Sequence, residues 1–189
     1  GSLTLRTALS YVMGKYDPLG LASPLSMKMK LLLRRTHPVA GGWDLDLPPD
    51  IKTAWGKLVT ELKDAGTIFF PRSTVPPEEL GQFGEPLPVG FGDGSLVGFM
   101  AMVYAVWPRR SGGAEVFLVL AKARVAPLGG TTTPRMEMSS AALLARLMVL
   151  VARSCGFKAK EVVMALDSEC TVAALQKRDR VLKPYFSHR

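Results

Sequence analysis

The stretch Leu87-Pro88-Val89-Gly90-Phe91-Gly92-Asp93-Gly94-Ser95 decides how the second half of this chain folds. Its large apolar residues Leu87, Val89 and Phe91 stand at alternate positions, which is the period of a β-strand with one buried face. Asp93 falls on the same face as these three residues. We therefore expect a strand that carries an acidic side chain near its end, just before a glycine-containing turn.

The residues after this strand predict an antiparallel meander. Residues 98–107 and 115–125 are rich in β-branched, aromatic and other apolar side chains and read as two further strands. The loop between them contains Gly112 and Gly113, which is typical of a hairpin connection.

A long helix and a fourth strand are predicted next. Thr133 can cap, and Pro134 can open, an apolar helix that continues to about Ser154. Residues 162–166 form a continuous apolar run, typical of a strand covered on both faces, and a further helix is expected over 168–178. The fold class is therefore α/β, with a mixed sheet.

The first seventy residues predict helices separated by proline-rich corners. Apolar residues recur at helical spacing over 5–13 and again from about residue 48 to residue 62, and Ser23 is placed to cap a helix that runs to Arg35. Prolines then cluster between residues 71 and 88, and we place the boundary between the helical part and the sheet near 75–84.

Composition narrows the classes of function. The formal net charge of +8 raises the local concentration of polyanions, of which nucleic acid is the commonest. No run of 18 apolar residues and no signal-peptide pattern is present, so we expect a soluble intracellular protein. Cys155 and Cys170 follow no metal-binding spacing, which favours buried or idle thiols over a zinc site or a disulfide.

Three acids predict a divalent-metal site. Asp93 lies near the end of the first strand, Glu137 in the first turn of the long helix, and Asp167 directly after the fourth strand. Two-metal hydrolysis of a phosphodiester needs several carboxylates to hold cations about 3.5–4 Å apart. Because Asp93 and Asp167 end apolar strands, we expect both charges to be desolvated and therefore to need a cation or a donor.

Each acid also has a structural explanation that competes with the metal site. Asp93 begins a glycine-rich turn, where Asp is common for local hydrogen bonds. Glu137 suits the positive end of a helix, and Asp167 can cap the helix that follows it. The metal hypothesis depends on the three acids as a set.

The sequence resembles the polyprotein of BEL/Pao-type retrotransposons, where the end of reverse transcriptase passes into the ribonuclease H domain. Residues 16–24 resemble its Y-D-P-L-G-L-x-S-P segment and residues 91–95 its F-x-D-A-S strand. Residues 121–128 and 133–138 are similar to its S-K-x-R-V-A-P-L and I-P-R-L-E-L motifs, the most specific stretch, and 163–168 resemble the strand carrying W-T-D-S. Residues 185–189 look like its later F-V-x-N-R.

The resemblance implies a ribonuclease H-like mixed sheet over residues 79–189, preceded by a helical thumb or connection-like segment over 1–78. It aligns Asp93, Glu137 and Asp167 with the first three acids of the ribonuclease H metal site. The implied cofactor is Mg²⁺, with Mn²⁺ as a substitute. The implied partners are RNA–DNA hybrid or other nucleic acid and the remaining reverse transcriptase domains, with no membrane. The implied location is the cytoplasm, virus-like particles or the nucleus.

The chain departs from the family pattern at several positions. Gly94 stands where Ala is usual, and the fourth acid of the family lies in a later N-P-A-D segment that these residues do not contain. Asp179 lies in a basic run and reads as a solvated helix end rather than a replacement ligand. The sequence also argues against an aspartic peptidase. Such an enzyme needs paired D-T/S-G loops, and the residues around Asp93 and Asp167 have another order.

The leading hypothesis is hydrolysis of the RNA strand of RNA–DNA hybrids by a two-metal mechanism. Lys122 and Arg124 are two residues apart on one predicted strand, so both point the same way, and with Arg135 they are expected to meet backbone phosphate. An exposed basic strand edge is the alternative for these residues. The alternative for the whole chain is a non-catalytic structural or nucleic-acid-binding module derived from a retroelement polyprotein.

Overall fold

The computed structural model describes residues 2–77, 80–157 and 162–176 of the 189-residue chain. The chain forms two compact units, one of Gly1–Pro18 with Ala22–Phe70 and the other of Leu19–Leu21 with Pro71–Arg189. The predicted domain boundary between residues 78 and 79 lies outside the described residues, as do Asp179 and the motif at 185–189. The two units are described separately.

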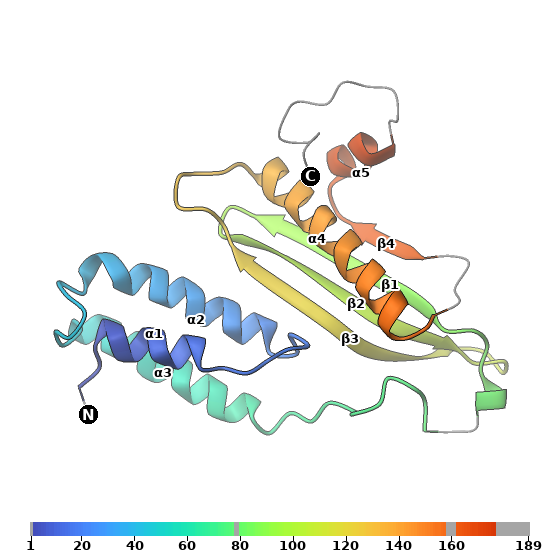
Figure 1. The fold of residues 1–189 in the computed structure, drawn as a ribbon, viewed down its shortest axis with the longest axis horizontal. Coiled ribbons are helices and arrows are strands. Elements are labelled where there is room, and N and C mark those ends of the chain that lie inside the picture. Colours follow the sequence, from blue (N-terminus) through green and yellow to red (C-terminus); the bar gives the residue numbers. More distant parts are fainter. Residues whose placement is uncertain (1, 78–79, 158–161, 177–189) are drawn as a thin grey trace. The chain divides into compact units, whose positions relative to one another are not determined.

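The first unit consists of three α-helices, as the sequence predicts (Figure 1). Thr4 caps the first helix, because its side chain accepts from the amide of Thr7 while the Thr7 hydroxyl accepts from the amide of Thr4. The second helix begins at Ser23 with Ala22 in the cap position, so the prediction that Ser23 is the cap is wrong by one residue. The helices are α1 (Leu5–Met13), α2 (Ser23–Thr36) and α3 (Pro49–Ala65), with a short 3₁₀ turn η1 (His37–Val39).

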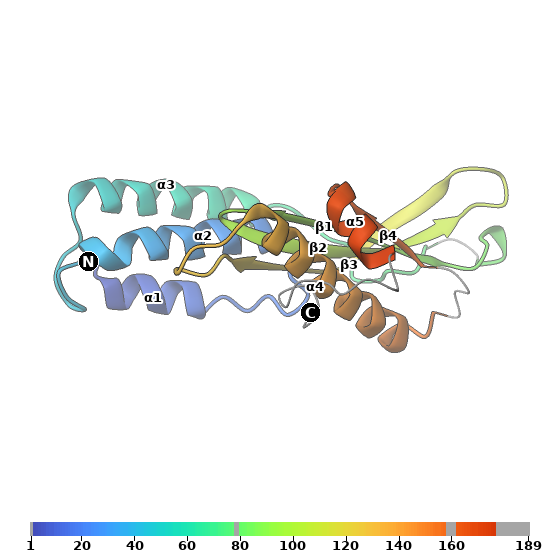
Figure 2. The same cartoon turned by 90° about the horizontal axis from the view of Figure 1, so that it is seen from above.

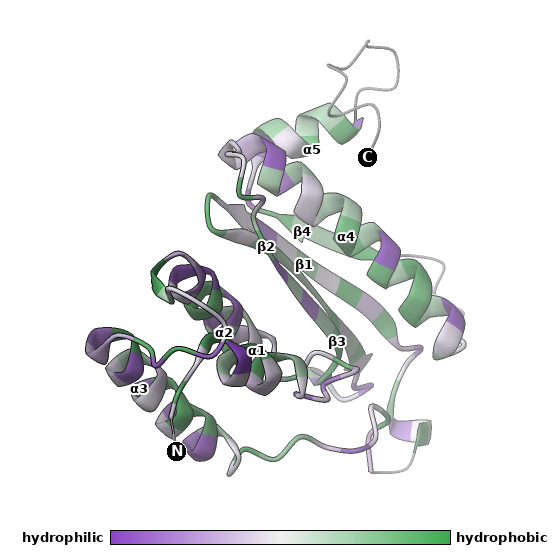
Figure 3. Cartoon of the chain, turned by 60° about the vertical axis from the view of Figure 1, so that its left-hand side comes forward, coloured by the Kyte–Doolittle hydropathy of each residue, from purple (hydrophilic) through white to green (hydrophobic). Residues whose placement is uncertain are grey.

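A single apolar core holds these helices together. Met29 and Trp55 are each 2% exposed and pack among the apolar faces of α1, α2 and α3, which run alongside one another (Figure 2). The indole Nε1 of Trp55 donates to the buried hydroxyl of Thr36 at 3.1 Å. Hydrophilic residues colour the outer faces of α2 and α3 in Figure 3, which is the amphipathic pattern that places one stripe of each helix in the core.

Within the residues that the structure describes, the second unit is built on a four-stranded mixed sheet in the order β3-β2-β1-β4. The first three strands pair antiparallel and β4 pairs parallel with β1, so the predicted fold class is confirmed. Among the described residues, the elements of this unit are η2 (Leu80–Gln82), β1 (Leu87–Ser95), β2 (Gly98–Pro108), β3 (Ala114–Val125), α4 (Thr133–Ser154), β4 (Val163–Leu166) and α5 (Glu169–Gln176).

Helix α4 lies across one face of the sheet (Figures 1 and 2), and the glycines of β1 allow it to come close. A Cβ atom on Gly90 would lie 2.5 Å from Leu144 Cδ1, and one on Gly92 would lie 2.6 Å from Ser140 Oγ. A Cβ on Gly94 would lie 2.4 Å from the backbone nitrogen of Glu137. Every second residue from Gly90 to Gly94 therefore lacks a side chain, so that α4 can pack directly on the strand.

Two predictions about the edges of these elements are wrong. Helix α4 begins at Thr133 itself, with Thr132 in the cap position and no side-chain cap bond. Strand β4 is not covered on both faces, because Val163 is 44% and Met164 38% exposed. The strand has β1 as its one partner within the described part of the sheet, and an edge position leaves more of each side chain in contact with solvent.

The described helices do not include one long and apolar enough to cross a membrane. Cys155 and Cys170 are free, and both are exposed rather than buried. Partial burial nevertheless raises the pKa of the Cys155 thiol above its ordinary value.

Candidate metal centre at the ends of strands β1 and β4

The two aspartates of the predicted site lie at the carboxyl ends of neighbouring parallel strands. The β1–β4 ladder pairs Gly92 with Leu166, so Asp93 and Asp167 follow side by side as the next residue of each strand. Because the glycines of β1 face α4, the alternation of side chains puts Asp93 on the opposite face of the sheet. Both aspartates line one pocket there, together with Phe91.

The expectation that these two carboxylates are desolvated is wrong. Asp93 and Asp167 are both exposed, and Phe91 beside them is 45% exposed. The apolar residues of β1 on this face have no layer over them among the described residues, so water reaches both aspartates. Among the described residues, neither aspartate side chain forms a hydrogen bond or ion pair, which leaves all four carboxylate oxygens available to a ligand.

The third acid reaches the strand ends from the other face of the sheet. Glu137 is the fifth residue of α4, in its second turn rather than the predicted first turn. Its backbone lies against Gly94, the residue after Asp93. Its carboxylate oxygen Oε2 accepts a 2.6 Å hydrogen bond from the hydroxyl of Ser168, the residue after Asp167. Glu137 therefore touches the chain neighbour of each of the other two acids.

The structural alternatives for the three acids lose weight in this arrangement. Ser168, not Asp167, stands before α5 and accepts from the Thr171 amide at 3.2 Å, as a helix cap does. Asp93 lies within the β1–β2 ladder and not in a local turn bond. The helix dipole acts most strongly in the first turn of a helix, and Glu137 lies beyond that turn.

Asp93 and Asp167 have the chemistry and the position of metal ligands, whereas Glu137 lies to one side of them. Carboxylates on adjacent strand ends supply the oxygen ligands that Mg²⁺ prefers, and this ion is usually held by one or two carboxylates with water and substrate phosphate. Within the described ranges no group of three His, Cys, Asp or Glu side chains is already arranged around a common point. Asp93 and Asp167 would hold the cation, and Glu137 would join them through Oε1, the carboxylate oxygen that is not bonded to Ser168.

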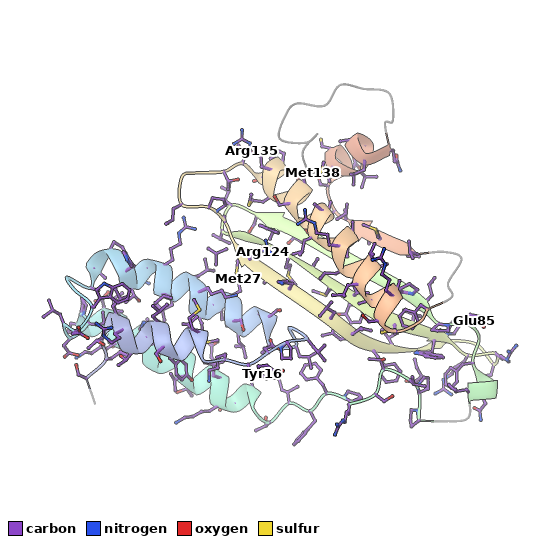
Figure 4. All side chains as sticks on the ribbon, viewed as in Figure 1. Tyr16, Met27, Glu85, Arg124, Arg135 and Met138 are labelled. Atoms are coloured by element: carbon purple, nitrogen blue, oxygen red, sulfur yellow. The ribbon has the colours of Figure 1, made fainter. Side chains whose placement is uncertain are left out.

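The predicted phosphate-binding residues lie on the α4 side of the sheet. Lys122 and Arg124 are exposed on β3 and face the same way, because their ladder partners are the alternate residues Ala101 and Phe99 of β2. Arg124 lies near the end of β3 and the exposed Arg135 near the start of α4 (Figure 4). The structure thus confirms that the two strand cations share a face but does not test their role.

Two residues that sequence reasoning missed organise this site. Gly94 was noted as a departure from a family pattern, but its steric role follows from the helix that packs on it. The signal was present as three glycines at alternate positions 90, 92 and 94 of one strand. Ser168 could have been recognised as a helix cap, whereas its bond to Glu137 joins residues 31 positions apart and had no local signal.

Comparison with known proteins gives one finding. A model of the family described as Pao retrotransposon-like RNaseH-like domain matches residues 4–168, which is most of the chain and includes all three acids. No curated protein and no solved structure gives a match.

Proposed function

This chain belongs to the Pao retrotransposon-like RNaseH-like domain family, and we propose that it uses Asp93, Glu137 and Asp167 to hydrolyse the RNA strand of RNA–DNA hybrids. The observation that carries the proposal is the position of Glu137. Its backbone packs against Gly94, the residue after Asp93, and its carboxylate accepts a hydrogen bond from Ser168, the residue after Asp167. Three acids from a strand, a helix and a second strand are thereby brought to one end of the sheet.

The chemistry assigned to each residue follows from its place. Asp93 and Asp167 are exposed at one pocket and would bind a divalent cation directly. Glu137 approaches from the α4 side and would bind at the flank of this pair. A bound divalent cation supplies an activated water and stabilises the leaving oxygen of the phosphodiester. The protein's own contribution is to hold the carboxylates at an open site where a nucleic-acid strand can reach them.

Metal binding is the first test of this proposal. Isothermal titration of Mg²⁺ or Mn²⁺ into the protein is expected to show binding that Asp93→Asn weakens or abolishes. Glu85→Gln is the matched control, because it also removes one negative charge. Glu85 lies just before the start of β1, whereas Asp93 lies near the end of this strand (Figure 4). Absence of binding, or equal binding by both variants and the wild type, would overturn the metal site.

Cleavage of a labelled RNA–DNA hybrid separates the enzyme from the alternative, a non-catalytic nucleic-acid-binding module. The enzyme is expected to shorten the RNA strand only when Mg²⁺ or Mn²⁺ is added, and Asp167→Asn is expected to prevent this. Hybrid binding without cleavage, at saturating metal, would favour the non-catalytic module.

We further propose that Lys122, Arg124 and Arg135 contact the phosphates of the hybrid. Each phosphate contact contributes nearly one to the slope of log affinity against log salt, so Lys122→Ala with Arg124→Ala is expected to reduce that slope by about 2. The double variant Arg146→Ala with Arg153→Ala removes the same charge from exposed positions on α4 and serves as control. An unchanged slope in the first variant would refute the phosphate role.

A further inference from the structure

Ser168 makes two hydrogen bonds that connect separate parts of the candidate site. Its hydroxyl donates to Glu137 Oε2 at 2.6 Å and accepts from the Thr171 amide at 3.2 Å. The first bond reaches from the end of β4 to α4, and the second stays within the first turn of α5. One small side chain therefore fixes the start of α5 and contacts an acid on another helix.

The chemistry of a hydroxyl group sets the direction of both bonds. A serine hydroxyl has one proton to give and two lone pairs to receive with. The Thr171 amide can only donate, so the single hydroxyl proton is available for the Glu137 carboxylate. Thr171 is 1% exposed, so the amide that anchors the hydroxyl is itself held in place by packing. The Ser168 hydroxyl is consequently held by two partners, the Thr171 amide that donates to it and the Glu137 carboxylate that accepts from it.

The bond also decides which oxygen of Glu137 is available. Oε2 is engaged by Ser168, whereas Oε1 has no hydrogen-bond partner among the described residues. A carboxylate held through one oxygen presents the other in a restricted direction, which reduces the rotational freedom that a metal ligand would otherwise lose on binding. Glu137 is half-buried, so protein rather than bulk water surrounds much of this bond.

We infer that Ser168 is a positioning residue that orients Glu137 toward the cation held by Asp93 and Asp167. The inference rests on the proposed function, since it concerns the same metal site. Ser168 does not touch the cation in this scheme and acts only through the Glu137 carboxylate. Outer partners of metal-binding carboxylates typically contribute a factor of about 10–100 in metal affinity or activity, and we expect an effect of that size here.

The test measures Mn²⁺ affinity of the whole chain by electron paramagnetic resonance of the free ion, with the melting temperature as a separate readout. Ser168→Ala removes both hydrogen bonds, whereas Ser168→Gly removes the donor but keeps most of the capping preference. Ser168→Thr retains the hydroxyl. The same Ser168→Ala change is also made in a Glu137→Ala background, where a residue that acts through Glu137 has nothing left to act upon.

The expected result is a Mn²⁺ affinity about 10–100-fold weaker in both Ser168→Ala and Ser168→Gly, with wild-type affinity in Ser168→Thr. Ser168→Ala should cause no further loss once Glu137 is Ala. If the wild type binds Mn²⁺ and Ser168→Gly binds it equally well, Ser168 is only a helix cap and the inference is wrong while the proposed function stands. If the wild type binds no Mn²⁺, the proposed function fails and this inference fails with it.

Discussion

Gly94→Ala is a small substitution with a specific expected consequence for both stability and metal binding. In this structure an added Cβ would lie 2.4 Å from Glu137 N, 2.4 Å from Met136 C and 2.6 Å from Met136 O. All three atoms belong to the backbone of α4, so no side-chain rotation relieves the overlap. Ordinary contact begins near 3.4 Å, and 3.4 − 2.4 gives a required displacement of 1.0 Å for the start of the helix.

The magnitude follows from two opposing effects. Overpacking of this kind typically costs about 1–3 kcal/mol, and the lower entropy of the unfolded chain with Ala in place of Gly returns about 0.4–1 kcal/mol. We expect a net destabilisation of about 1–2 kcal/mol from these two terms. The displaced backbone is that of Glu137, and a 1 Å misplacement can cost about 100-fold in a catalytic step, so metal binding should weaken as well.

Gly90→Ala is the matched control, because it makes the same change on the same face of β1. Its Cβ would meet Leu144 Cδ1 at 2.5 Å and Met148 Sδ at 2.9 Å, which are the ends of flexible side chains and can move aside. Urea unfolding of both variants, with Mn²⁺ titration, should show the larger loss of stability and the loss of affinity in Gly94→Ala. Equal stability and equal Mn²⁺ affinity in Gly94→Ala and the wild type would refute the close approach of α4.

Three further predictions concern the helical unit. Thr36→Val should cost about 1–3 kcal/mol in urea unfolding, because the buried indole N–H of Trp55 loses its acceptor, whereas Thr36→Ser should retain most of the stability; equal unfolding curves would contradict this. Gly56→Ala should stabilise α3 by about 0.5–1 kcal/mol, since an added Cβ there meets no atom within 4 Å, and a lower melting temperature would argue against it. The guanidinium of Arg6 lowers the pKa of Asp44 through a hydrogen bond. This pair should therefore stabilise the folded unit fully at pH values above the ordinary pKa of an aspartate. Its contribution should be lost as the pH falls through the lowered pKa of Asp44 in the folded state. Asp44→Asn should flatten the acid side of the stability curve, by a small amount because the pair is exposed, and an unchanged acid side would show that the pair contributes nothing.

The order of elements in the sheet unit could be predicted because each has a period of its own. Alternate apolar residues in β1 and the long apolar helix before Ser154 are local patterns, and the structure places them within one or two residues of the prediction. The apolar run at residues 162–166 was different. A continuous apolar run indicates a strand but contains no information on how many neighbours the strand has, and β4 proved to be an exposed edge of the described sheet.

The desolvation argument for the aspartates failed for the same reason. The apolar residues before Asp93 predict a buried face, but burial depends on a second layer, and on this face the described residues do not provide one. The glycines on the other face of β1 identify the side that is packed. In this strand, the glycines indicate the packed face better than the large apolar residues do.

Exposure of Asp93 and Asp167 changes what the metal site requires of the fold. Two buried carboxylates would have needed a cation to offset their desolvation, so folding and metal binding would have been a single event. Exposed carboxylates are hydrated and need no such partner, so the second unit can hold its shape through the packing of α4 on β1. Under the proposed function the fold therefore does not require the cation, although a cation that binds the folded state adds to its stability. Glu137 is the acid that connects the proposed site to the packed helix α4. Its backbone packs against Gly94, and its carboxylate accepts a hydrogen bond from Ser168, the residue that follows Asp167. In the proposed scheme this bond orients the carboxylate toward the two aspartates.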